Sequence, residues 1–237
     1  MFMNTNLTES DISFLQLSDS FFPTGMYTMS NGLEALFYRN KKLSYDVIKD
    51  LIQVSIKYQI GPVDCCAISN AYTLIETKDY DALKQLDNKL YFMRLVQETR
   101  EASVRSGVQL IKCVKSFVTS TTDNVLEYYN KCIQEKSVTG IYPISFAVCC
   151  HSLNISKEKS ALMLLYGYIV SVIGAALRLG VIQHYDGQKI IHDLQTDIIT
   201  VIKENINKPV SDMWQFIPGL EIVQMYHEQM DSKMFIT

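Results

Sequence analysis

The sequence predicts an all-α protein: a single domain, residues 1–237, built as a bundle of about ten helices around a central apolar helix. Three observations support this prediction. The 237 residues include only 10 Gly and 5 Pro, which disfavours a turn-rich β fold. Apolar residues recur at steps of three and four, as on one face of a helix. Alternating strand patterns longer than a few residues, repeats and low-complexity linkers are absent from the sequence.

Capping residues and breakers mark the amino-terminal helices. Thr8 and Asp11 resemble a capping box that opens a first helix, and the Phe-Pro-Thr-Gly turn at residues 22–25 ends it. A second short helix has apolar residues in helical spacing up to Phe37 and stops near Asn40.

The next helices are separated by a strong breaker. Ser44 can cap a helix that extends from residue 45 to about 59. We expect Gly61-Pro62 to break that helix, with Pro62 in the first turn of the following one, which runs to about residue 77.

The middle of the chain is predicted to be helical as well. Asp79 opens one long helical region that continues to about residue 117. The polar cluster at 119–123 indicates a loop, and short helices are expected over about 125–138 and 144–153.

The central helix is the most apolar segment. Ser156 is its expected cap, no residue between Ser160 and Leu177 is charged, and Gly180 ends it. Such a run is at the lower limit for a membrane span. It holds two tyrosines and two glycines and has polar helical flanks, so we interpret it as a buried helix and predict no membrane association. Small residues lie four apart on one of its faces, where a neighbour can approach closely: Gly167, Ser171 and Ala175.

Two further helices complete the prediction. Asp186 begins a helix whose apolar face continues to Ile202 and which Pro209 stops. After Pro218-Gly219, a last short helix is expected from Glu221 to about Met230.

Composition and motifs exclude several classes of function. The 22 basic and 25 acidic residues give a net charge of −3, without the basic excess of a general nucleic-acid binder. The motifs GxxxxGK[ST], GxGxxG, HExxH, CxxC and GxSxG are absent. The residues themselves therefore predict a binding protein rather than a self-sufficient enzyme.

The cysteines suggest a compartment and a metal-binding alternative. Four of the six cysteines form adjacent pairs, no signal peptide is visible, and we predict a reducing cytoplasm. Cys149, Cys150 and His151 form the one local cluster of soft ligands, of the kinds that bind nickel, zinc or copper. Successive helical residues point about 100° apart, so three neighbours rarely face one ion, and core packing is the preferred interpretation.

Five stretches of sequence, in order along most of the chain, resemble one protein family. They are Leu-Gln-Leu-Ser-Asp-Ser-Phe-Phe-Pro-Thr-Gly with Ser-Asn-Gly-Leu-Glu within 15–34, Gly-Pro-Val-Asp at 61–64, Arg-Glu-Ala-Ser with Gly within 100–107, Ala-Ala-Leu-Arg-Leu-Gly with Gly-Gln within 175–188, and Pro-Gly-Leu-Glu-Ile with His-Glu and Phe within 218–235. In these stretches the chain is similar to the urease accessory protein F (UreF) family.

The resemblance implies an all-helical, non-catalytic protein that dimerises. It implies a scaffold that joins the accessory protein docked on urease, called D or H, to the nickel-carrying GTPase, accessory protein G. The assembly delivers nickel to apo-urease, and modulation of GTP hydrolysis is a further implied role. Nickel passes through such a complex, and no tightly bound cofactor is expected.

The resemblance also selects candidate residues. Residues 210–237 are implied to be a partner-binding carboxyl-terminal segment, with Glu221, His227 and Phe235 as contacts. Glu34 and Arg178 are the other candidates for an interface or a passage. Arg178 could equally cap the carbonyls at the end of the central helix, and Glu34 could form an ion pair within the fold.

The chain departs from the family pattern at two places. Met26-Tyr27 stands where the family commonly has Gly-Gly or Gly-Ser followed by Phe, and Met does not tolerate a positive φ as Gly does. Lys233-Met234-Phe235 replaces the usual Arg-Leu-Phe, and Lys lacks the planar fork of Arg.

Two alternatives to the scaffold remain open at this point. One is a direct nickel carrier with Cys149, Cys150 or His151 as ligands. The other is a helical di-metal carboxylate enzyme, which requires Glu-x-x-His pairs. No histidine has the required Glu three residues before it; those positions hold Val148, Val181, Lys189 and Gln224.

Overall fold

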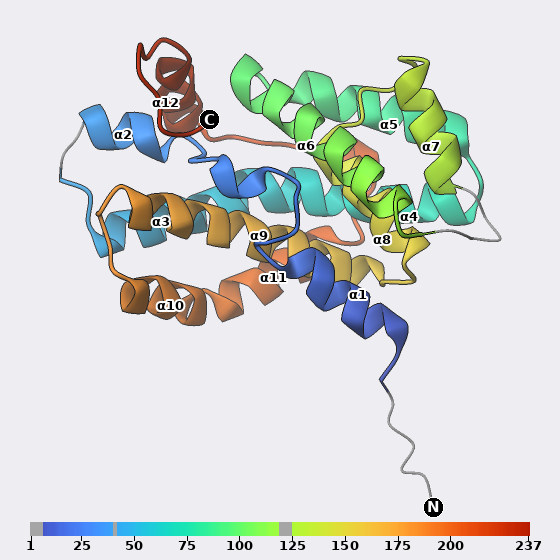
Figure 1. Ribbon diagram of the computed structural model, residues 1–237, viewed down its shortest axis with the longest axis horizontal. Coiled ribbons are helices and arrows are strands. Elements are labelled where there is room, and N and C mark those ends of the chain that lie inside the picture. The colour runs from blue at the N-terminus through green and yellow to red at the C-terminus, as the bar shows by residue number, and fades with distance from the viewer. Residues whose placement is uncertain (1–6, 40–41, 119–124) are drawn as a thin grey trace, which may run out of the picture.

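Helices connected by short turns make up the structure, a computed structural model that describes residues 7–39, 42–118 and 125–237 (Figure 1). The described part contains no strand, which confirms the all-α prediction. The α-helices are α1 (Glu9–Ser18), α2 (Leu33–Arg39), α3 (Tyr45–Ser55), α4 (Cys66–Glu76), α5 (Tyr80–Met93), α6 (Gln97–Lys115), α7 (Val125–Gln134), α8 (Tyr142–Ser152), α9 (Lys157–Arg178), α10 (His184–Asp193), α11 (Gln195–Asn205) and α12 (Pro218–Glu228). Shorter elements are the 3₁₀ turns η1 (Met26–Thr28) and η3 (Val210–Asp212) and a π-helical stretch, η2 (Ile56–Cys65).

Local capping chemistry fixes the predicted helix starts. The Asp11 carboxylate accepts a hydrogen bond from the Thr8 backbone N–H at 3.0 Å. This is the bond of a capping box in which the third residue of the helix reaches back to the capping residue. Ser44 and Ser156 each accept from the backbone three residues on, at 3.5 and 3.3 Å. Asp79 does the same at the start of α5, at 3.1 Å. These four predicted starts are confirmed.

The expected break at Gly61-Pro62 is wrong. The backbone stays helical from α3 through η2 into α4, because the turns widen to a π-helix around Pro62. Proline lacks an N–H and crowds the preceding turn of an α-helix, and π-bulges are one way in which helices absorb such a residue. A Cβ atom on Gly61 would lie 2.3 Å from Val201 Cγ1, so this glycine allows α11 to pack against η2.

Two other predicted helices are each divided. The region from residue 79 to 117 is two helices, α5 and α6, joined through the extended residue Arg94. The helix predicted from Asp186 is also two, α10 and α11, and this splitting is why there are twelve α-helices among the described residues rather than about ten. The last helix begins at Pro218, before the expected Glu221. The predicted loop at 119–123 lies outside the described residues.

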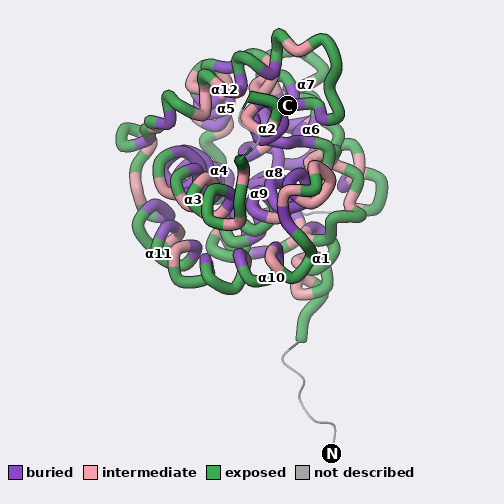
Figure 2. Tube along the Cα trace, turned by 90° about the vertical axis from the view of Figure 1, so that its left-hand side faces the viewer, coloured by how far each residue is buried: buried purple, intermediate pink, exposed green. Residues whose placement is uncertain are grey.

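The apolar helix α9 runs through the centre of the molecule (Figures 1 and 2). It packs against α8, α4, α1, α11 and η2. It is the one described helix long and apolar enough to cross a membrane, and 72% of its apolar window is buried inside the fold. On its small-residue face, Ser171 donates to the carbonyls of Met26 and Met29, at 2.9 and 3.1 Å, which holds the η1 turn against it. Burial in the protein therefore accounts for its composition.

The η1 turn resolves the question raised by Met26. The positive φ, 81°, falls on Gly25, and Met26 begins a right-handed 3₁₀ turn. The chain therefore makes this turn with one glycine.

Candidate functional site

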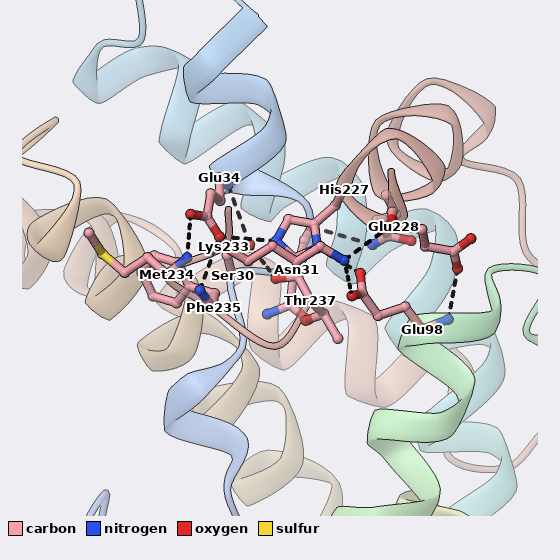
Figure 3. A network of polar contacts seen from close by, with 11 residues as sticks. Ser30, Asn31, Glu34, Glu98, His227, Glu228, Lys233, Met234, Phe235 and Thr237 are labelled. Atoms are coloured by element: carbon pink, nitrogen blue, oxygen red, sulfur yellow. Dashed lines mark hydrogen bonds and ion pairs between the residues drawn. The ribbon is translucent and has the colours of Figure 1, made fainter. Parts of the chain in front are cut away.

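The carboxyl-terminal segment packs against residues 28–34, which precede and begin α2 (Figure 3). After α12 the backbone runs beside the residues that precede α2. Ile236 N donates to Thr28 O at 3.0 Å, and Ser30 N donates to Thr237 O at 2.8 Å. The Ser30 hydroxyl also donates to Thr237 O. Residues 28–34 and the carboxyl-terminal segment, about 200 positions apart in sequence, thus meet in one site.

Glu34 is the centre of this site. It lies in the first turn of α2, where a negative charge is favoured by the helix dipole, and its side chain is fully buried. Its carboxylate accepts hydrogen bonds from the backbone of Met234 at 2.7 Å and of Phe235 at 3.0 Å. It also contacts His227 Nε2 at 3.0 Å. One carboxylate therefore fixes both α12 and the segment that follows it.

The turn before α2 brings these groups together. Asn31 and Gly32 have φ values of 54° and 88°, a left-handed conformation that favours Asn and Gly. A Cβ atom on Gly32 would lie 2.9 Å from Gln224 Cγ, so the absence of a side chain lets α12 approach. Gln224 Nε2 donates to Asn31 O at 3.3 Å across this contact.

His227 connects Glu34 to a second carboxylate. The ring is fully buried, and its Nδ1 lies 2.6 Å from Glu98 Oε2. Lys233 Nζ lies 2.8 Å from Glu98 Oε1. Each ring nitrogen of His227 therefore faces a carboxylate oxygen. We name Glu34, Glu98, His227 and Lys233 the C-terminal latch.

Sequence reasoning found part of the latch. It selected Glu34 and His227 and did not include Glu98 or Lys233 among the site residues. The Lys233 departure from the family's Arg is explained by a contact with a single carboxylate oxygen, which an ammonium makes without a planar fork. No local signal marks Glu98, because its role depends on residues in α12 and beyond.

The remaining candidates are distributed around the latch. The Arg178 guanidinium lies 4.4 Å from the centre of the buried Phe235 ring, and Arg178 Nε donates to Gly174 O at 3.0 Å. Arg178 therefore contacts both its own helix end and the carboxyl-terminal segment. Glu221 lies apart from them at the start of α12, where it accepts from Gln215 Nε2 at 3.1 Å and burial raises the pKa of its carboxyl.

Helix α12 has an unusual distribution of side chains. Its two buried residues, Gln224 and His227, are polar. Its exposed residues include Ile222, Met225 and Tyr226. Amphipathic helices of soluble domains normally bury the apolar face, so α12 leaves apolar side chains partly exposed, although the Arg39 guanidinium of α2 lies over the Tyr226 ring, 3.8 Å from its centre.

The cysteine cluster does not fit a metal centre. Cys149 and Cys150 lie on α8 and are fully buried, and burial raises the pKa of Cys150 to about 12 and also raises that of Cys149 well above its usual value. Metal ligation requires the thiolate form. The His151 ring packs edge-on against Tyr72, with ring centres 5.4 Å apart. Within the described residues, no three His, Cys, Asp or Glu side chains are placed to hold a metal ion.

The fold and the site define a class of protein: a helical protein whose carboxyl-terminal helix is held by a buried ionic latch and presents apolar residues outward. Residues 46–195 match the UreF family, and the chain belongs to this family of urease accessory proteins. It is 28% identical over 233 residues to urease accessory protein UreF of Trichodesmium erythraeum, covering 98% of this chain and 99% of that protein. It is 30% identical over 227 residues to UreF of a Bacillus species, strain TB-90, covering 95% and 98%. UreF of Haemophilus influenzae strain PittGG is 26% identical over 235 residues, covering 99% and 98%.

Proposed function

We propose that this protein is a non-catalytic scaffold of urease maturation. It joins the accessory protein docked on urease, D or H, to the nickel-carrying GTPase, accessory protein G, acts as a homodimer in the cytoplasm and modulates GTP hydrolysis. Nickel is the cargo that passes through the complex to apo-urease and is not a resident cofactor. Membership of the UreF family supports the urease accessory role, and the surface of α12 supports a docking function.

The outward apolar face of α12 is the observation that carries this proposal. Ile222 is 53% exposed, and Met225 and Tyr226 are exposed beside it. Fully burying such a side chain stabilises by about 1.5–3 kcal/mol, so covering the exposed half of Ile222 contributes about 1 kcal/mol to binding. Aromatic residues and Met are also enriched in interfaces.

The latch residues act as positioning residues in this proposal. Glu34, His227 and Phe235 are buried within the chain, so they hold α12 and the segment after it in place while the outer face contacts the partner. Deleting everything after Pro218 is expected to abolish partner binding and leave the rest helical. The deletion also strips Glu34 of three hydrogen-bond donors, so a surface substitution separates binding from stability more cleanly.

The matched test is a pair of isoleucines. Ile222→Ser changes the α12 surface, and Ile199→Ser changes a residue of α11 with nearly the same exposure, 52% against 53%. After co-expression with the accessory proteins D or H and G, light scattering is expected to show all three chains in the wild-type complex and in the Ile199 variant. The Ile222 variant is expected to bind the docking partner at least about fivefold more weakly, the equivalent of 1 kcal/mol. Equal affinity of the two variants would remove α12 from the interface.

A further inference from the structure

A partly open cavity of about 60 Å³, with a mostly apolar surface and several polar residues in its lining, lies between helices of the protein. Residues from α6, α9, η2 and α12 line it, and α12 reaches it through Gln224, one of its two buried side chains. Its lining is mixed, with Met29, Ile60 and Leu164 among the apolar residues. The polar residues that line it include Asn31, Asp64, Arg94, Thr99, Tyr168 and Gln224.

Four of the lining residues carry buried polar atoms that bond to no described protein group. These atoms are Asn31 Nδ2, Arg94 Nε, Thr99 Oγ1 and Tyr168 OH. The Arg94 side chain is held in place, because its Nη2 donates to Asp64 Oδ1 at 2.7 Å. Its Nε nevertheless has no partner among the described protein groups. The Ser55 hydroxyl lies near Tyr168 and donates to Leu51 O at 2.8 Å.

Such a concentration of unpaired buried polar atoms around one cavity is unusual. Most buried polar atoms in folded proteins have a hydrogen-bond partner, and orphaned atoms are strongly unfavourable. Asn31, Arg94 and Tyr168 are 7%, 8% and 6% exposed, so bulk solvent does not reach them freely. Two of the four atoms are obligate donors and two are hydroxyls that donate or accept, a set that suits a small ligand with acceptor and donor capacity.

We propose that the cavity is a binding site for a cluster of ordered water molecules that bridges α12 to α6 and α9. A buried water needs about 10–15 Å³ of such space and two to four polar partners, so about 60 Å³ has room for about four to six waters. The waters complete the bonding of Arg94 and Thr99 and connect them to the Gln224 side of α12. Helix α12 thus rests on the body of the protein through a hydrated seam as well as through the latch.

Removing a single hydroxyl distinguishes a hydrated cavity from a dry one. In Thr99→Val the shape is kept and the Thr99 hydroxyl is lost, and Thr and Val have similar helix propensities. In a dry cavity the change removes an orphaned polar atom and raises Tm. In a hydrated cavity it removes a hydrogen bond to water, and Tm is expected to fall by about 2–4 °C.

A second variant and a direct observation complete the test. Tyr168→Phe is expected to lower Tm in the same way, while Tyr72→Phe calibrates the loss of a hydroxyl that bonds to protein groups, Ile155 O and Ser160 Oγ, both at 2.7 Å. A high-resolution crystal structure of the full chain is expected to show ordered water within hydrogen-bond distance of Thr99 Oγ1 and Arg94 Nε. A Tm at or above that of the wild type in both cavity variants, or a cavity free of water density, would overturn the proposal.

Discussion

Replacing Glu34 with Gln tests whether the C-terminal latch stabilises the protein. The carboxylate of Glu34 receives the backbone N–H groups of Met234 and Phe235 and contacts His227 Nε2. Gln has the same shape, but one of its terminal atoms is an NH₂ donor and would face one of these donors. The change also leaves Glu98 as the one latch carboxylate in contact with His227 and Lys233.

The expected loss of stability in Glu34→Gln is large. Breaking a buried ion pair by removing one partner costs about 3–5 kcal/mol. A loss of 1 kcal/mol lowers Tm by about 2–4 °C in a domain of this size, so Glu34→Gln is expected to lower Tm by about 6–20 °C. Thermal unfolding followed by circular dichroism measures this shift. Hydrogen exchange of residues 229–237 is expected to accelerate, because two of their amides lose a charged acceptor.

Glu135→Gln is the matched control. Its side chain is 57% exposed and pairs with Lys131 at 3.6 Å, an arrangement of little energetic value. Its Tm is expected to stay within about 2 °C of the wild type. If Glu34→Gln melts in that same range and the Met234 and Phe235 amides keep their protection, the latch does not contribute the stability that its geometry implies.

Three further predictions concern other parts of the fold. The hydrogen bond from Lys159 lowers the pKa of Asp11 to about 2, so its stabilisation is present above about pH 4 and is lost as the pH falls through about 2; Lys159→Met is expected to raise that pKa in a carboxyl NMR titration. Gly61→Ala is expected to lower the free energy of unfolding by about 1–3 kcal/mol, because the new Cβ would lie 2.7 Å from Ile56 O and against Val201. Gly167→Ala is expected to raise it by about 0.5–1 kcal/mol, because nothing lies within 4 Å of the new Cβ. Urea unfolding compares the two variants. The adjacent buried thiols of α8 are expected to stay unmodified by a thiol reagent at pH 8 until the protein is unfolded, since burial keeps them protonated.

The sequence was most informative where structure depends on near neighbours. Thr8, Ser44, Asp79 and Ser156 each bond within a few residues, so their capping roles are visible in the chain. Pro62 misled the prediction because its local preference is to end a helix, whereas the widened turns of η2 and the packing of α11 against Gly61 keep the backbone helical. Tertiary packing decides such a case, and a single sequence does not record it.

The latch shows the same limit at the candidate site. Glu34 and His227 lie 193 residues apart, and only the family resemblance marked both. Glu98 lies within the helical region predicted from residue 79 to about 117 and was not singled out, because nothing near it in sequence indicates a buried histidine as its partner. The inverted polarity of α12 was equally hidden, since apolar periodicity identifies a face without saying whether the fold covers it.

The separation between the latch partners has a consequence for biosynthesis. Translation adds about 5–20 residues per second, and the partners of Glu34 near the end of this sequence emerge after every other helix. Until then the Glu34 carboxylate lacks the three groups that form hydrogen bonds with it in the folded protein, and its burial is unfavourable. We therefore expect α2 to gain these contacts, and α12 to be held in place, only after residues 227–235 have been synthesised. A prematurely terminated product would lack both the apolar surface of α12 and the C-terminal latch, and we expect it to be more sensitive to proteolysis.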